Sequence, residues 1–164
     1  MANKKQILLV EDNIADADIF MRIFNQCGYE AKIDAVRDGE QALQYLRRSD
    51  SFGDAPPVDL VLLDLNLPKK GGKEVLQELK QDSGLKLIPI LILSSSTQEK
   101  DVQDSYQLGA CGYLIKPYSL PELQRTVRAI GDFWVRAVHF PTPSVFASSS
   151  TPVQSSRIEE DGSK

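Results

Sequence analysis

Three short apolar runs of this chain each end in a charged side chain. The runs and their charges are residues 7–10 with Glu11 and Asp12, residues 60–63 with Asp64, and residues 112–115 with Lys116. If the runs are parallel buried strands, their carboxyl ends lie at one edge of a sheet, and three carboxylates and one ammonium meet there. Carboxylates gathered so closely are costly without a cation. The pattern therefore predicts a divalent metal site and phosphate chemistry on Asp64.

Each of these side chains suits a step of that chemistry. A carboxylate attacks phosphorus without a general base, so Asp64 can be the nucleophile. Magnesium prefers oxygen ligands in octahedral geometry, and we expect Asp12 and Asp64 to bind it directly and Glu11 mainly through water. Lys116 supplies a fixed positive charge that pairs with Asp64 and later with a phosphoryl oxygen. Ser94, which ends another apolar run, can hydrogen-bond the transferred group.

The elements that must position these residues alternate along the chain. Short aliphatic runs predict strands, and apolar residues at helical spacing between them predict helices. The expected strands cover residues 6–10, 29–36, 58–63, 88–93 and 111–115, the expected helix caps are Asn13, Asp38, Ser96 and Ser119, and a further helix covers residues 73–81. This order predicts an α/β fold, a doubly wound five-stranded parallel sheet of order 2-1-3-4-5 with helices on both faces. In that order the first and third strands are neighbours at the point where ligand sites lie.

The composition is that of an ordinary soluble domain. The chain has 164 residues, of which 41% are hydrophobic and 26% charged, and a net charge of −4. The charge excludes a broad basic field for nucleic acid, and no apolar stretch approaches the roughly 20 residues that span a bilayer. Cys27 and Cys111 are too few for a disulfide framework, so we expect small buried thiols in a cytoplasmic protein.

The last part of the chain has a different composition. From about Pro141, prolines stand among serines and threonines and are followed by an acidic stretch. Such a segment cannot bury enough apolar surface to fold alone. We therefore expect one folded domain over residues 1–140 and a largely flexible tail over residues 141–164. Phe140, Val145 and Phe146 are exceptions that could dock on the domain or on a partner.

Taken together, these residues resemble the receiver domain of two-component response regulators, over about residues 5–138. The family's pattern is an acidic pair, a phosphoacceptor aspartate, a strand-end Ser or Thr, an aromatic residue and Lys-Pro. It stands here in order as Glu11 and Asp12, Asp64, Ser94, Tyr113, and Lys116 with Pro117. Ser95 and Ser96 compete with Ser94, and the family's spacing back from the lysine selects Ser94.

The resemblance implies a function and further roles. Such a domain accepts a phosphoryl group from a histidine kinase, with Mg²⁺ required, and takes part in its own phosphorylation and dephosphorylation without being an enzyme. It implies that Asn66 offers a backbone carbonyl to the metal and that the Lys116–Pro117 peptide is cis. It also implies that Asn66 and Ser96 tune the hydrolysis of the acyl phosphate, and that Tyr113 switches between exposed and buried positions.

Three segments narrow the resemblance. The loop over residues 49–57, the turn over residues 68–72 and the sequence Asp132-Phe133-Trp134 are similar to the small, single-domain regulators paired with bacterial phytochromes. This similarity implies a phytochrome-type sensor kinase as partner and output through protein contacts. We expect the last helix and the extension over residues 133–146 to form a homodimer or to dock on the kinase, with no nucleic acid or membrane as partner.

Other functions share part of this pattern. A magnesium-dependent phosphatase with a strand-end aspartate nucleophile usually needs a second acid two residues on, where this chain has Asn66. A flavodoxin-like cofactor binder needs Gly, Ser or Thr in the first turn, where this chain has Glu11 and Asp12. The alternative that we retain is a pseudo-receiver, which scaffolds other proteins without being phosphorylated, although the complete residue set argues against it.

Overall fold

Five parallel strands form one central sheet in the order β2-β1-β3-β4-β5. The computed structural model describes residues 3–142. The strands are β1 (Lys5–Val10), β2 (Ala31–Val36), β3 (Leu60–Leu63), β4 (Ile90–Ser94) and β5 (Gly112–Ile115). The strand order and direction are those expected from the sequence, so the prediction of a doubly wound α/β fold is confirmed.

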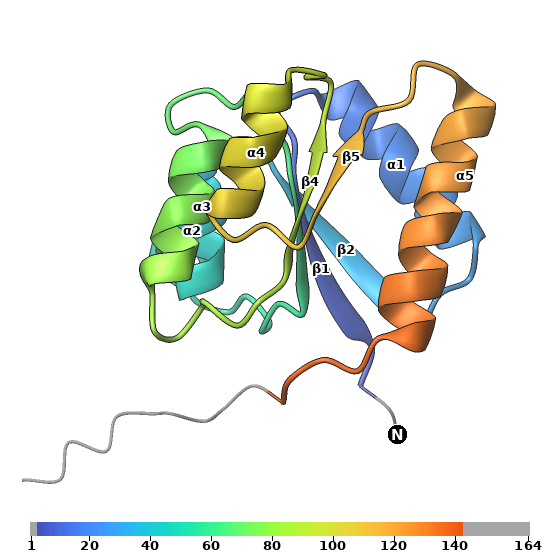
Figure 1. Ribbon diagram of the computed structural model, residues 1–164. Helices are drawn as coiled ribbons and strands as arrows, with labels where there is room; N and C mark the ends of the chain where they lie inside the picture. Colours follow the sequence, from blue (N-terminus) through green and yellow to red (C-terminus); the bar gives the residue numbers. More distant parts are fainter. Residues whose placement is uncertain (1–2, 143–164) are drawn as a thin grey trace, which may run out of the picture.

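Helices cover both faces of this sheet (Figure 1). They are α1 (Ile14–Gln26), α2 (Gly39–Arg47), α3 (Gly72–Gln81), α4 (Glu99–Gln107) and α5 (Leu120–Ile130), with the short η1 (Asp50–Phe52) and η2 (Gly131–Ala137), a π-helical continuation of α5. Helices α1 and α5 lie on one face, and α2, α3 and α4 lie on the other. Within residues 3–142, no helix is long and apolar enough to cross a membrane.

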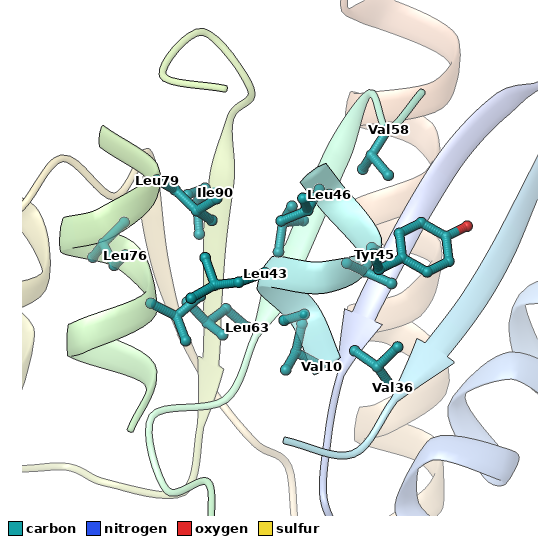
Figure 2. Close-up of a cluster of buried hydrophobic side chains, with 14 of the residues drawn as sticks. Val10, Val36, Leu43, Tyr45, Leu46, Val58, Leu63, Leu76, Leu79 and Ile90 are labelled. Atoms are coloured by element: carbon teal, nitrogen blue, oxygen red, sulfur yellow. The ribbon is translucent and has the colours of Figure 1, made fainter. Parts of the chain in front are cut away.

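The central strands are apolar on both faces because helices cover both faces. Along β1, Leu8 and Val10 belong to the core under α2 and α3, whereas Ile7 and Leu9 belong to the core under α1 and α5. Figure 2 shows the first core, where side chains of α2 and α3 meet those of the sheet. The residues labelled there are Val10, Val36, Leu43, Tyr45, Leu46, Val58, Leu63, Leu76, Leu79 and Ile90. Two cores therefore hold the strands whose ends carry the charged residues.

Helix starts follow the predicted caps in three places out of four. Asn13 Oδ1 accepts from the N–H of Asp16 at 3.1 Å, Asp38 Oδ1 from Gln41 at 2.8 Å, and Ser119 Oγ from Glu122 at 3.3 Å. The prediction that Ser96 caps the next helix is wrong, because α4 begins at Glu99 and the residue before it is Gln98. The Ser96 hydroxyl donates instead to the carboxylate of Asp101, inside the first turn of α4.

The expectation of two buried thiols is also wrong. Cys27 is half-buried at the end of α1, and Cys111 is exposed. Cys111 comes directly before β5, which is an edge strand that pairs only with β4. A residue at the end of an edge strand has a neighbouring strand on one side only, so its side chain is less completely covered.

The extension after α5 folds back onto the domain. Phe140 is buried, and its ring centroid lies 6.2 Å from that of Trp134. The Nζ of Lys5 lies 5.2 Å from the ring centroid of Phe140. The prediction that Phe140 could dock on the domain is thus confirmed. Phe133, by contrast, is 57% exposed on η2. Of the tail expected over residues 141–164, the part from position 143 onward, with Val145 and Phe146, lies outside the described residues.

A close contact at the start of α3 supports the strand end that precedes it. A Cβ atom on Gly72 would lie 2.2 Å from the backbone carbonyl oxygen of Asp64 and 2.7 Å from the Cα atom of Leu65. The backbone of α3 therefore rests directly against the segment that leaves β3. Only a residue without a side chain permits this approach.

Substitution of Gly72 by alanine is expected to lower the free energy of unfolding by about 1–3 kcal/mol, because the added methyl group overpacks the strand end. Gly53→Ala is the matched control, since its Cβ would meet nothing within 4 Å and its φ is −55°. The control should stay within about 0.5 kcal/mol of the parent protein. Urea unfolding of the three proteins measures both effects. Equal stability of the two variants would contradict the contact.

Candidate metal and phosphoryl site

The register of β1 and β3 places two acids side by side. Val10 pairs with Leu63, so the residues that follow, Glu11 and Asp64, leave the sheet at the same edge. Each side chain is buried, whereas Asp12 is exposed at the mouth of the site. Carboxylate oxygens of Glu11, Asp12 and Asp64 lie within 4.8 Å of one another. The structure thus brings together the three acids that the sequence pattern selected.

Lys116 brings the opposite charge to the same place. It follows β5, and its backbone N–H donates to the carbonyl of Ser94 at 2.8 Å, which extends the pairing of β5 with β4. Its Nζ donates to Asp64 Oδ2 at 2.7 Å and also to a carboxylate oxygen of Glu11. One ammonium is therefore shared between two buried carboxylates that come from different strands.

Burial and charge act against each other in this cluster. Burial raises the pKa of Glu11 above its ordinary value, although hydrogen bonds from Lys116 and from the backbone of Asn13 act to lower it. Burial alone would lower the pKa of Lys116, but its hydrogen bonds to Asp64 and Glu11 raise it overall. The ammonium consequently stays charged at neutral pH, while Glu11 is harder to ionise than an exposed glutamate.

Backbone groups orient both buried carboxylates. The N–H of Asn66 donates to Asp64 Oδ1 at 3.1 Å, and the N–H of Asn13 donates to Glu11 Oε1 at 3.1 Å. Asp64 is thereby held at both oxygens, one by the following loop and one by Lys116. Asn66 itself is exposed, two residues after the phosphoacceptor candidate.

Ser94 and Tyr113 meet at the loop between β4 and α4. Ser94 is fully buried, and its Oγ accepts a hydrogen bond from the N–H of Ser96 at 3.2 Å. The half-buried Tyr113 donates from its hydroxyl to the carbonyl of Ser96 at 2.9 Å. Of the two competing serines, Ser95 is exposed and Ser96 is half-buried. Both side chains that are expected to respond to phosphorylation thus contact one residue, Ser96.

One expectation drawn from the family resemblance is wrong. No peptide bond of the part of the chain that the structure describes is cis, so the Lys116–Pro117 peptide is trans. The trans isomer is the intrinsically favoured one even before proline. With this isomer, Lys116 still reaches Asp64 and Glu11.

The sequence did not indicate an ion-pair cluster that lies close to the loop between β4 and α4. Lys73 Nζ, at the start of α3, donates to Asp101 Oδ1 at 2.7 Å and to Asp104 Oδ2 at 2.9 Å, both in α4. The partners lie 28 and 31 residues away along the chain. At such separations, charge pattern carries no local signal, and only the packing of α3 beside α4 reveals the pairing.

The donor set suits a hard divalent cation. Carboxylate oxygens and backbone carbonyl oxygens are the ligands that Mg²⁺ and Ca²⁺ prefer, and Mg²⁺ retains several waters as well. An exposed carboxylate of Asp12 beside the buried one of Asp64 offers such oxygens at an open edge of the sheet. A cation here would also favour the ionised form of Glu11, whose pKa burial raises.

Comparison with known proteins agrees with this geometry. Residues 7–128 match the response regulator receiver domain family. The methanogenesis regulatory protein FilR2 of Methanothrix harundinacea, itself described as probable, is 43% identical over 138 residues, which are 84% of this chain and 88% of FilR2. Response regulator Rcp1 of Synechocystis sp. is 40% identical over 137 residues, which are 84% of this chain and 93% of Rcp1.

Two solved structures resemble the chain closely. The crystal structure of the Mn²⁺-bound form of Rcp1 has a TM-score of 0.80 and 40% identity, and the match covers 84% of this chain and 99% of that one. The crystal structure of the phosphorylated cyanobacterial phytochrome response regulator RcpA has a TM-score of 0.80 and 41% identity, with the same coverage of 84% and 99%.

Addition of MgCl₂ is expected to raise the melting temperature of the protein, because a ligand that binds only the folded state stabilises it by RT ln(1 + [L]/Kd), which is about 2.7 kcal/mol at a hundredfold excess over Kd. Asp12→Asn should abolish most of the rise, since it removes an exposed oxygen ligand without disturbing the buried pair. Asp18→Asn, an exposed acid on α1, is the control and should respond like the parent protein. Differential scanning calorimetry measures all three. An equal rise in Asp12→Asn would place the metal elsewhere.

Proposed function

The chain belongs to the response regulator receiver domain family, and on that premise we propose that it takes a phosphoryl group on Asp64 from a sensor histidine kinase and signals through altered protein contacts. One observation carries the proposal. Asp64 is buried at the end of β3 between Glu11, Asp12 and the ammonium of Lys116, with both of its oxygens oriented by hydrogen bonds. An aspartate that merely ended a strand would need none of these partners.

The transfer uses Asp64 as nucleophile. A carboxylate oxygen attacks the phosphorus of phosphohistidine, the P–N bond breaks, and the imidazole nitrogen keeps the electron pair and takes up a proton. Such transfers depend on positioning and on neutralising charge rather than on covalent help from the protein. The N–H of Asn66 and the ammonium of Lys116 fix the carboxylate for attack.

The metal of this site is proposed to be Mg²⁺. Asp12, Asp64 and the backbone carbonyl of Asn66 would bind it directly, and Glu11 would act mainly through water. When bound, the cation neutralises charge on the phosphoryl oxygens. The Mn²⁺-bound crystal structure of the relative Rcp1 supports the proposal of a divalent cation in this chain.

The phosphorylated state differs from the free state mainly in charge. A phosphoryl group on Asp64 replaces one negative charge by about two and adds acceptor oxygens. Lys116 already points at this carboxylate, and the Ser94 hydroxyl, whose oxygen accepts from Ser96, keeps its own proton to donate. Movement of Ser94 toward the new oxygens would displace Ser96 and, through it, Tyr113. The equilibrium between two conformations of the β4–α4 surface would then shift.

Similarity to three phytochrome-linked regulators supports a choice of partner. RcpA is described as a cyanobacterial phytochrome response regulator, and further solved neighbours are bacteriophytochrome response regulators. We infer that a phytochrome-type histidine kinase is the phosphodonor of this chain. We further propose that the protein acts in the cytoplasm, as a regulator and not as an enzyme that turns over a substrate. We also propose that residues 1–140 form the receiver domain and that a separate tail follows it.

A phosphorylation-independent pseudo-receiver is the less favoured function. Such a scaffold has no need for an acidic pair, a strand-end aspartate and a lysine at one site, yet all four side chains meet here. The phosphorylated structure of the relative RcpA, at 41% identity, also argues for phosphoryl acceptance.

Incubation with acetyl phosphate and MgCl₂ is expected to add one phosphoryl group to the protein, observed by intact mass spectrometry. Asp64→Asn should gain none, because an amide is a poor nucleophile, and removal of the metal with EDTA should prevent the gain as well. Asp18→Asn should be phosphorylated like the parent. No gain in the parent, although a known receiver domain gains mass in a parallel tube, would favour the scaffold.

Phe133→Ser is expected to weaken a homodimer of the full chain, because this 57% exposed aromatic side chain lies on the extension that we propose as the interface. Tyr106→Ser is the matched control, since Tyr106 is 51% exposed and lies on α4, on the opposite face of the sheet from α5. Sedimentation equilibrium of the phosphorylated and free proteins measures the association. A dimer that survives Phe133→Ser but not Tyr106→Ser would put the interface on the other face of the sheet.

A further inference from the structure

Besides a local hydrogen bond from the N–H of Gln98 to its hydroxyl oxygen at 3.4 Å, Ser96 makes three hydrogen bonds to other groups. Its N–H donates to Ser94 Oγ, its carbonyl accepts from the Tyr113 hydroxyl at 2.9 Å, and its own hydroxyl donates to the carboxylate of Asp101. The first two contacts join it to the side chains expected to respond to phosphorylation. The third joins it to α4. The position of Ser96 therefore depends on where Asp101 is held.

Asp101 is held in turn by Lys73, from a different helix. The Nζ of Lys73 lies 2.7 Å from Asp101 Oδ1, and the Ser96 hydroxyl uses the other oxygen, Oδ2. Lys73 also contacts Asp104 Oδ2 at 2.9 Å, so one ammonium ties α3 to two turns of α4. Figure 1 shows these two helices side by side on the same face of the sheet. A continuous series of polar contacts thus runs from Ser94 to α3.

Both partners of this contact are charged at neutral pH. Hydrogen bonding to Asp101 and Asp104 raises the pKa of Lys73, and hydrogen bonds from Lys73 and then Ser96 lower the pKa of Asp101. The side chains of Lys73 and Asp101 are 33% and 26% exposed, so solvent screens the pair only in part.

A simpler role for Asp101 does not account for these contacts. An acid in the first turn of a helix is stabilised by the helix dipole without any side-chain partner. Glu99 fills that role in the same turn of α4. Asp101 instead accepts a hydrogen bond from Lys73 at one oxygen and from Ser96 at the other, so that it connects α3 to the β4–α4 loop.

We propose that Lys73 and Asp101 are positioning residues that hold Ser96 against Ser94 and thereby set the lifetime of phosphoryl-Asp64. The proposal rests on the proposed function of the site. Hydrolysis of the acyl phosphate adds water to phosphorus and breaks the bond to the Asp64 oxygen, giving a carboxylate and inorganic phosphate. With Lys73 removed, Asp101 no longer fixes Ser96, Ser94 loses its orienting N–H, and water reaches the phosphorus more freely.

The test measures the decay of the phosphorylated full chain. The parent, Lys73→Met and Lys73→Arg are phosphorylated with acetyl phosphate and MgCl₂, freed of donor by desalting, and followed by intact mass spectrometry. Lys73→Met is expected to decay at least about twofold faster, the lower end for a coupled contact of this kind. Lys73→Arg should restore the parental lifetime, because a guanidinium can pair with both acids.

Lys100→Met is the matched control. Lys100 also contacts Asp104 Oδ2, at 3.0 Å, but it has no contact with Asp101 among the hydrogen bonds of residues 3–142. Its removal deletes the same charge from the same cluster and should leave the lifetime unchanged. Circular dichroism melting of each variant separates loss of positioning from loss of fold.

A second comparison asks whether Lys73 acts through Ser96. In a Ser96→Ala background, Lys73→Met should have no further effect on the lifetime, since the contact that it supports is already gone. Additive effects of the two substitutions, or a parental lifetime in Lys73→Met, would overturn the inference while the proposed function stands. A parent protein that acquires no phosphoryl group defeats both.

Discussion

The structure depends on the burial of two like charges at adjoining strand ends. Glu11 and Asp64 are placed together by the pairing of β1 with β3, and neither can move away without breaking the sheet. Buried carboxylates require partners, since desolvation disfavours their charge. One partner, Lys116, comes from a distant part of the chain after β5, and the others are backbone N–H groups of the loops that directly follow β1 and β3. The topology of the sheet and the chemistry of the site are therefore one constraint.

The loops around the site are correspondingly tied down. Gly72 brings the start of α3 against the backbone of Asp64, and Ser96 links the β4–α4 loop to Ser94 and Tyr113. Each tie joins a strand end to the helix that follows it or to a neighbouring strand. A change of charge on Asp64 therefore acts first on the groups that already contact its carboxylate, the ammonium of Lys116 and the N–H of Asn66. This arrangement suits a protein whose output is a change of surface.

Sequence patterns predicted what local chemistry and strand order determine. The charged strand ends, three of the four caps and the sheet order follow from apolar runs and short-range hydrogen bonding. The Ser96 cap failed because Asp101 offers that hydroxyl a charged acceptor. The exposure of Cys111 depends on which strand lies at the edge, and the Lys73 pair depends on how two helices pack. These features are set by tertiary packing, which one-dimensional spacing does not contain.

The burial of Phe140 fixes the position of the last described residues of the chain. Its contacts with Trp134 and Lys5 place residues 140–142 beside the amino-terminal start of β1, together with Val58 and Pro89, which precede β3 and β4. Asp64 lies at the opposite, carboxyl-terminal edge of the sheet. A fluorophore or an affinity handle joined at Thr142 would therefore lie at the edge opposite Asp64, so that the site of this carboxylate stays accessible while the protein is anchored to a surface.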